Sequence, residues 1–458
     1  FSLAKCTTMI FAFAISTAYS GRDPASVTPA EILGERGATN RRVLRLDEAL
    51  VLAVAHSREY QTQKEQLYLA ALSLTGARYA FSPQFFAEST AQVAGTVEGP
   101  DTGSVRSQVG VSQLLRTGGR LSVSLANDLL RYFTGWSSSP GNTSRDSAIN
   151  LLSVSLTQPL LRGFGRNDPA VEALTQSERN VVYAIRDFTQ FQHEFAVSIV
   201  NDYFNLAATK DVVRNNYTNY LRRVDTTQYL EARSVDRVRA SDVDDARSAE
   251  LSAKIGYINA VATYLNAQAA FKLTLGLPLT EDVHVVDDDL AQLAATGLIP
   301  ADISRDAAFQ MAVNNHMDIL NAIDRFEDTQ RKVRVAADQL KPALGIFSTA
   351  SLQSQEQYDY ANFNIDDLRY SAGLTVDLPV DRLRERNTYR AALVSFESQV
   401  RTLGLTLDSF RDRIERGLRT LEQRRLNFEN RRMALEVAER RVDTRQLRRF
   451  DRQRLQRL

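Results

Sequence analysis

Hydrophobic positions follow two different spacings along this chain, and the spacing changes at a proline. Before Pro159, apolar residues alternate with serine and threonine up to Leu156, which predicts a β-strand with one apolar face. Beyond Pro169, apolar residues recur every three, four or seven positions as far as Leu230, as in a coiled-coil helix. Because this segment contains no further glycine or proline, we expect one helix of roughly 95 Å at a rise of 1.5 Å per residue.

Further elements follow from the same reasoning. A shorter amphipathic helix is expected from Asp47, as a plausible N-cap, to Ala80, because Pro83 would end it. Two alternating segments, Val109–Leu115 and Arg120–Asn127, flank a Thr-Gly-Gly sequence and predict a β-hairpin. A return helix rich in small residues is predicted between Val243 and Leu275, where a Gly-Leu-Pro sequence stops it.

Two ordered pairs of similar segments indicate that the chain is a duplication. The sequence around Ala49 resembles that around Ala308, an offset of 259 residues. The segments VSLTQPLLRGFGRN and LTVDLPVDRLRERN are related by an offset of 220 residues, which carries Pro159 onto Pro379. In the second copy, alternating residues are again followed by coiled-coil spacing, which predicts a strand pair and a second long helix.

The N-terminal residues have the pattern of an export signal. Lys5 precedes an apolar run, Met9 to Tyr19, that is too short to span a bilayer, and we expect cleavage before Gly21. The alternative is a buried N-terminal strand or helix. The chain is accordingly divided into a signal peptide at 1–20, a first repeat at 21–300 and a second repeat at 301–458.

Composition argues against several functional classes. The 458 residues include 56 Lys+Arg and 55 Asp+Glu, a balance that gives no support to a nucleic-acid partner. Mean hydropathy is −0.29, which argues against a polytopic helical membrane protein. Cys6 is the single cysteine, so we expect neither an internal disulfide framework nor a cysteine metal site. Phosphate-loop, GxSxG and HExxH motifs are absent, and we expect no enzyme activity, cofactor or metal.

Two features are compatible with more than one interpretation. Gly163 and Gly165 lie at a strand-to-helix corner, and we interpret them as turn geometry, because the third glycine of a phosphate-binding fingerprint is missing. The arginine-rich segment 411–457 alternates arginine with Glu, Asp and Gln around a heptad seam. It fits a solvated coiled-coil face better than a nucleic-acid-binding tail.

The order of the predicted elements resembles the TolC-like outer-membrane efflux proteins. The residues that carry the resemblance are LDEALVLAVAHSREY at 46–60, Pro83, QPLLRGFG at 158–165 and LTLGLP at 273–278. The resemblance implies a mainly α fold with a small antiparallel β part. It further implies internally duplicated long coiled-coil α-hairpins, and membrane β-strands that close into a barrel only in a trimer. The expanded first strand region leaves the number of barrel strands open.

The resemblance also implies a function and partners. The chain is expected to be an outer-membrane channel, the passive exit duct of a tripartite efflux pump or a type I secretion system, that projects into the periplasm. Its partners would be two further copies in a homotrimer, a periplasmic adaptor (membrane fusion) protein, an inner-membrane RND, ABC or MFS transporter, and outer-membrane lipid. The alternative is a structural periplasmic coiled-coil protein without channel activity. Since the 220-residue offset carries Leu230 onto Phe450, the second repeat is expected to lack its return helix.

Two sets of residues are candidate functional sites. The turn between the long helices is the candidate periplasmic gate and adaptor contact, with Arg233, Asp236, Arg237, Arg239, Asp242 and Asp245. In a trimer, Asp242 and Asp245 would form acidic rings that bind cations, whereas the alternative is a solvated, charged helix end. The candidate strand-to-helix corners are formed by Pro159, Gly163, Gly165 and Pro379.

Overall fold

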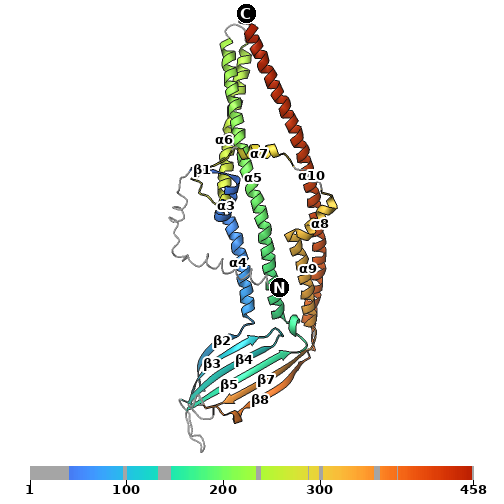
Figure 1. The fold of residues 1–458 in the computed structure, drawn as a ribbon. Coiled ribbons are helices and arrows are strands. Elements are labelled where there is room, and N and C mark those ends of the chain that lie inside the picture. The colour runs from blue at the N-terminus through green and yellow to red at the C-terminus, as the bar shows by residue number, and fades with distance from the viewer. Residues whose placement is uncertain are drawn as a thin grey trace, which may run out of the picture. The chain divides into compact units, whose positions relative to one another are not determined.

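The computed structural model describes most of the chain (Figure 1). The described residues are 41–95, 101–132, 146–233, 239–286, 288–298, 303–354, 362–378 and 380–455. Three predicted features lie outside the described residues: the signal peptide, the centre of the candidate gate with Asp236 and Arg237, and Pro379.

Groups of helices and groups of strands follow one another along the chain. In chain order they are β1 (Arg41–Leu44), α3 (Leu46–His56), α4 (Arg58–Tyr79), β2 (Gln84–Ala94), β3 (Thr102–Leu114), β4 (Arg120–Tyr132), β5 (Asp146–Pro159), η2 (Gly165–Asn167), α5 (Pro169–Arg233), α6 (Ala240–Leu275), β6 (Asp282–Val285), α7 (Asp288–Thr296), α8 (Arg305–Asn315), α9 (Met317–Asp338), β7 (Ala343–Gln353), η3 (Ile365–Asp367), β8 (Arg369–Asp377) and α10 (Leu383–Leu455). The predicted long helix is confirmed as α5, with 65 residues, and the return helix as α6. No helix among the described residues is long and apolar enough to cross a membrane.

The prediction for the first helix is wrong in two respects. It is two helices, α3 and α4, separated at Ser57, which has extended backbone. The break allows a close approach of another segment, since a Cβ added to Gly276 would lie 2.1 Å from the carbonyl oxygen of His56. The N-cap is Arg45, whose backbone N–H donates to the Glu48 carboxylate over 3.3 Å. Asp47 lies within the first turn, where its charge interacts favourably with the helix dipole.

The duplication is confirmed by matching elements. Helices α3 and α8 have 11 residues each, α4 and α9 have 22 each, and β2 and β7 have 11 each. The helix breaks at Ser57 and His316 are related by the same 259-residue offset that the sequence contains. Each repeat therefore leads a broken helix into the first strand of its part of the sheet.

The six-stranded sheet is antiparallel throughout, in the order β2-β3-β4-β5-β7-β8. The predicted hairpin is confirmed as β3 and β4, where Leu114 pairs with Arg120 and Gly118 has a φ of +85°. Strands β2 and β8 form the two edges of the sheet as the described residues define it (Figure 1). Edge strands expose a row of unpaired backbone groups, which folded proteins cover or pair.

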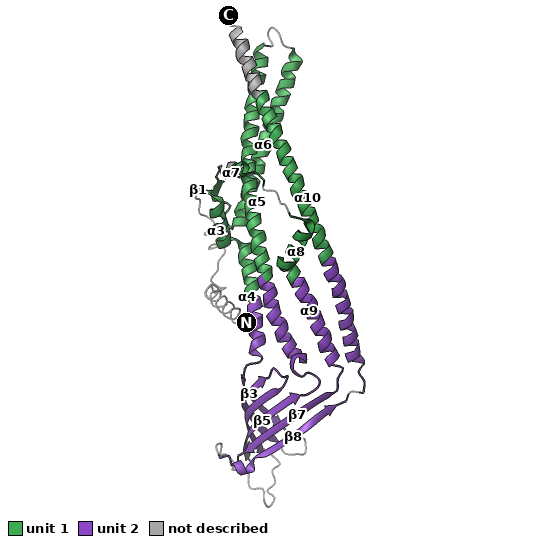
Figure 2. Cartoon of the chain, turned by 45° about the vertical axis from the view of Figure 1, so that its right-hand side comes forward, with its two compact units in different colours: residues 1–68, 186–320, 407–458 green, residues 69–185, 321–406 purple. Residues whose placement is uncertain are grey.

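The chain divides into two compact units, coloured separately in Figure 2. Unit 1 comprises 1–68, 186–320 and 407–458, and unit 2 comprises 69–185 and 321–406. In unit 1, the parallel pair β1 and β6 packs with α3, α5 and α6 around a common core. Tyr203 is fully buried there, and its hydroxyl donates to Asp289 over 2.6 Å. Burial, followed by this hydrogen bond, raises the pKa of Tyr203.

Unit 2 contains the six-stranded sheet and the adjoining ends of four helices. Neighbouring helices contact one another in the order α4, α5, α9 and α10. Leu74 of α4 packs against Leu174 of α5, Arg179 of α5 binds Asp328 of α9, and the Phe326 ring of α9 lies 5.5 Å from the Phe396 ring of α10. Unit 2 therefore joins one antiparallel sheet to a row of four helix ends.

Candidate functional site

The six-stranded sheet has two chemically different faces. Because neighbouring side chains along a strand point to opposite faces, the strand register assigns each residue to one of them. We call one of them the apolar face, since it carries these exposed large side chains: Phe85, Val93, Val105, Val109, Val123, Leu125, Val154, Ile346, Tyr370, Leu374 and Val376. This confirms the predicted orientation of the β5 residues that alternate with serine. A contiguous exposed apolar surface of this kind marks an interaction with a protein or a membrane.

Polar side chains on the sheet pair across the strands. On the opposite face, which we call the polar face, the Ser122 and Ser155 hydroxyls lie 2.7 Å apart and those of Ser124 and Ser153 lie 2.8 Å apart. On the apolar face, Asn127 donates its side-chain amide to Asn150. Pairing of this kind satisfies the hydrogen-bonding groups of partly buried polar side chains.

The strand-to-helix corner after β5 is held by a buried carboxylate. Pro159 ends β5, and Gly163 and Gly165 have φ values of +74° and +64°, a conformation that favours glycine. The backbone N–H of Gly163 donates to Asp338 over 2.7 Å, and Lys341 binds the same fully buried carboxylate at 2.6 Å. Asp338 was missed by sequence reasoning, since its backbone partner Gly163 is 175 residues away and its counterpart at the 259-residue offset is a tyrosine.

A second buried carboxylate, Asp328 on α9, connects α9 to α5. Its side chain is 5% exposed and accepts four hydrogen bonds from charged and polar donors. The donors are Tyr183 at 2.7 Å, Gln176 at 2.9 Å, Arg179 at 3.0 Å and Arg331 at 2.7 Å. Both arginines also bind glutamates, Glu327 and Glu172 respectively. The result is a connected ionic network between helices that lie far apart in the sequence.

The network shifts the pKa of its members. Desolvation favours the neutral form of Asp328, but the hydrogen bonds from Tyr183 and Gln176 and the charge of Arg331 outweigh it and lower the pKa of Asp328. Burial and the hydrogen bond to Asp328 raise the pKa of Tyr183 to about 12. Desolvation opposes the charged forms of Arg179 and Arg331, yet their carboxylate partners raise the pKa of both. Asp328 and both arginines are therefore charged at neutral pH and Tyr183 is neutral, which suits a structural role better than proton transfer.

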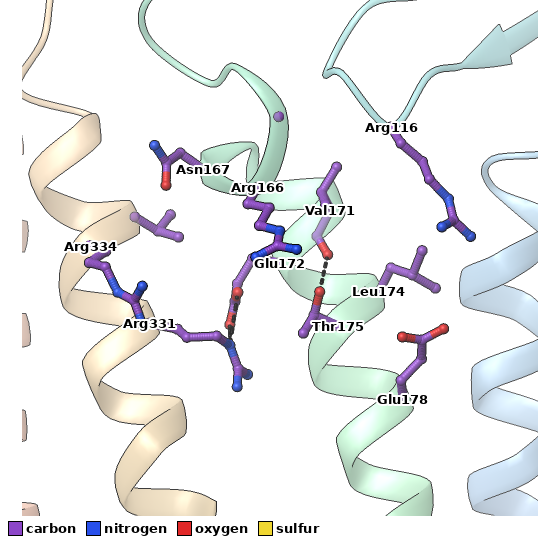
Figure 3. A pocket seen from close by; sticks show the side chains of 12 residues that line it. Arg116, Arg166, Asn167, Val171, Glu172, Leu174, Thr175, Glu178, Arg331 and Arg334 are labelled. Carbon is purple, nitrogen blue, oxygen red and sulfur yellow. Dashed lines mark hydrogen bonds and ion pairs between the residues drawn. The ribbon is translucent and has the colours of Figure 1, made fainter. Parts of the chain in front are cut away.

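A cavity of about 540 Å³ lies beside this network, next to the β3–β4 turn (Figure 3). Its charged lining residues are Arg116, Arg166, Glu172, Glu178, Arg331 and Arg334. Figure 3 shows Arg116 on the strand side, Glu172 and Glu178 on α5, and Arg331 and Arg334 on α9. No pattern in the sequence indicated this site, because its residues come from three separate segments.

The described residues of the candidate gate are exposed and surround the helix ends. Arg233 ends α5, and its guanidinium lies 4.9 Å from the centre of the Tyr229 ring. Arg239 is the N-cap of α6, and Asp242 and Asp245 lie exposed in its first two turns. Sequence reasoning missed the contacts that join the two helices near this end. Thr227 donates to the backbone oxygen of Ala246 over 3.3 Å, and Arg247 binds Glu231 at 3.4 Å.

Solved structures share this arrangement of long helices joined to an antiparallel sheet. The chain is similar to the outer membrane protein VceC of Vibrio cholerae, with 15% identity over 80% of this chain and 75% of that one, and a TM-score of 0.54. CusC is 13% identical over 86% of this chain and 80% of that one, with a TM-score of 0.59. The MtrE outer membrane channel of Neisseria gonorrhoeae is 13% identical over 81% of this chain and 72% of that one, with a TM-score of 0.55.

Comparison of sequences alone does not detect the similarity to these proteins. No protein-family profile and no curated protein matches the chain. The structural likeness confirms the predicted resemblance at the level of the fold: the chain has the TolC-like fold, mainly helical with an antiparallel sheet. CusC and MtrE, to which the chain is similar, are channels rather than enzymes.

Proposed function

We propose that this protein is an outer-membrane exit duct of an efflux or secretion system, in which the sheet crosses the outer membrane and the helices extend into the periplasm. The observation that carries the proposal is the exposed apolar face of the sheet. Phe85 is 83% exposed and Leu374 is 66% exposed. Contact with lipid would cover such side chains at a favourable free energy of about 25 cal/mol per Å².

The second part of the proposal is closure by copies of the same chain. Strand β2 and strand β8 are exposed along most of their length, whereas the interior strands β3 and β7 are mostly half-buried. An open sheet edge does not occur in lipid, since each unpaired backbone group costs several kcal/mol. An even number of antiparallel strands makes β8 and β2 run in opposite directions. Strand β8 of one copy therefore fits β2 of the next, which gives a head-to-tail ring.

The duplication supplies a register for this contact. Within the chain, β5 at the end of the first strand region pairs with β7 at the start of the second, and Val154 lies opposite Ala350. Advancing Val154 by the 220-residue offset gives Leu374 in β8, and moving Ala350 back by 259 residues gives Ala91 in β2. The contact between copies would thus place Leu374 opposite Ala91, with both on the apolar face.

A trimer closed in this way has a wide interior. Six strands from each of three copies make eighteen, and barrels of about 16–18 strands leave an aqueous channel. The polar face, with its serine and threonine pairs, would line that channel. Such a lining suits passage of hydrated solutes of several kinds.

The remaining partners are inferred from the same fold. We place the periplasmic gate and the adaptor contact at the end of α5 and α6, with Arg233, Arg239, Asp242 and Asp245 among the described residues. The charged, exposed helix ends there suit contact with a hydrophilic partner. An inner-membrane RND, ABC or MFS transporter would supply the energy, since the chain is a passive conduit.

Single-channel recording tests the proposal. Purified oligomer is inserted into planar lipid bilayers, and stepwise conductance is measured together with oligomer mass. We expect a trimer with discrete conductance steps. A folded protein that stays monomeric and gives no steps at any protein concentration would instead support the alternative, a structural periplasmic coiled-coil protein.

A further inference from the structure

Each edge strand of the six-stranded sheet carries a carboxylate on the polar face. Asp377 is the last residue of β8, and Glu88 lies in β2. On the neighbouring strand of the same chain, Asp377 lies opposite Ala343 and Glu88 lies opposite Gln108. Both carboxylates therefore face uncharged side chains within their own sheet.

Arg162 extends from the turn after β5 to the β8 edge of the sheet. Its guanidinium lies 3.7 Å from the Asp377 carboxylate, although β7 separates β5 from β8. The backbone beside Arg162 is fixed, because the N–H of Gly163 donates to the buried Asp338 carboxylate. The Asp377 side chain is still 64% exposed in this pair. The edge of the sheet thus presents a positive charge together with an accessible carboxylate.

The proposed contact between copies brings the two carboxylates together. Inside the chain, Thr157 of β5 pairs with Phe347 of β7. Advancing Thr157 by 220 residues gives Asp377, and moving Phe347 back by 259 residues gives Glu88. The register that places Leu374 opposite Ala91 therefore also places Asp377 opposite Glu88 of the next copy. Because the pair inside the chain is uncharged, the facing carboxylates are particular to the contact between copies.

Two carboxylates that face each other across antiparallel strands repel, since their Cβ atoms are only about 4.5–5.5 Å apart. We propose that Arg162 bridges Asp377 of its own copy and Glu88 of the next copy, so that every contact between copies contains a carboxylate–arginine–carboxylate triad. The guanidinium group has five N–H donors in a planar fork, which allows it to bind two carboxylates at once. This inference rests on the proposed closure of the sheet.

The triad would also fix the register of the contact. A shift of one residue would turn Glu88 away from the polar face of the partner strand. A shift of two residues would place Glu88 opposite Thr375 and away from Arg162. Only the register given by the duplication combines the three charged groups, so Arg162 acts as a specificity-determining residue for the partner edge.

The mass of the oligomer tests the triad. Wild type and variants are refolded in neutral detergent, and native mass spectrometry measures the trimer fraction across a dilution series. The variants are R162Q and the double variant R162Q/E88Q. The matched control, R120Q, removes the same charge from an exposed arginine on the polar face of the interior strand β4. Circular dichroism checks that every protein folds.

We expect R162Q to raise the dissociation constant of the trimer by about tenfold or more, because three contacts then each contain two unbridged carboxylates. The double variant should dissociate close to the wild-type concentration, and R120Q should match the wild type.

Rescue by E88Q separates this proposal from a role of Arg162 inside its own copy, where its partner is Asp377 rather than Glu88. A trimer unaffected by R162Q, or a loss that E88Q does not restore, would overturn the triad. A folded wild type that stays monomeric throughout the dilution series would instead overturn the closure of the sheet, and with it the proposed function.

Discussion

Removal of the Asp328 carboxylate is expected to destabilise unit 2 strongly. Asp328→Ala deletes the acceptor of four hydrogen bonds, and it leaves two arginines, Arg179 and Arg331, beside an apolar gap. The Asp328 side chain is 5% exposed, and that of Arg331 is 16% exposed. Breaking a buried ion pair from one side costs about 3–5 kcal/mol. Because Glu327 and Glu172 still bind the arginines, we expect about 3 kcal/mol, the lower end of that range.

Urea denaturation followed by far-ultraviolet circular dichroism measures this effect. The matched control is Glu422→Ala, which breaks an exposed pair with Arg425 on α10 and should leave the urea midpoint close to that of the wild type. Asp328→Asn keeps an acceptor oxygen without the charge, and its loss of stability should lie between those of Asp328→Ala and Glu422→Ala. A loss below about 1 kcal/mol for Asp328→Ala would refute the argument that the network holds α5 to α9.

Three further results are expected. Because the pKa of Asp328 is lowered in the folded state, its stabilisation is present above the unfolded pKa of about 3.9. It is lost as the pH falls through the folded value, so urea curves of wild type and Asp328→Ala should converge below about pH 4. Gly276→Ala should cost more than about 1–2 kcal/mol in thermal unfolding, since a positive φ adds to a backbone clash. Gly404→Ala, in open space on a helix, should instead stabilise by about 1 kcal/mol. Val109→Arg on the apolar face should make the free energy of insertion into lipid less favourable by about 2–4 kcal/mol in refolding titrations. Gln108→Arg on the polar face should insert as the wild type does. Equal effects of the two substitutions would contradict the assignment of faces.

Periodicity alone predicts the elements whose stability is local. The spacing of apolar residues along α5 and the alternation along β5 come directly from which side must be buried. The Gly-Leu-Pro stop after α6 likewise has a local cause, because Gly276 adopts a φ of +74° that other residues avoid. The duplication also follows from sequence, since the 259-residue offset between similar segments also relates the helix break at Ser57 to the break at His316.

The features that sequence could not predict depend on contacts between distant segments. Asp328 has the sequence signature of an ordinary surface aspartate on an amphipathic helix, and only the packing of α9 on α5 buries it. The break at Ser57 has no proline or glycine of its own, because its cause is the approach of Gly276. The parallel pairing of β1 with β6 involves two four-residue strands at opposite ends of the first repeat, too short to give a pattern.

Closure of the sheet between copies is tested most directly by a disulfide crosslink between β2 and β8. Ala91→Cys and Leu374→Cys are combined in a Cys6→Ser background, and membranes are oxidised before non-reducing electrophoresis. Residues opposite each other on antiparallel strands have Cα atoms about 4.5–5.5 Å apart, within the range for a disulfide. We expect crosslinked dimers and trimers for this pair, and monomers when Leu374→Cys is replaced by Thr375→Cys, because Thr375 lies on the polar face. Monomers from both combinations, or equal crosslinking by both, would contradict this closure.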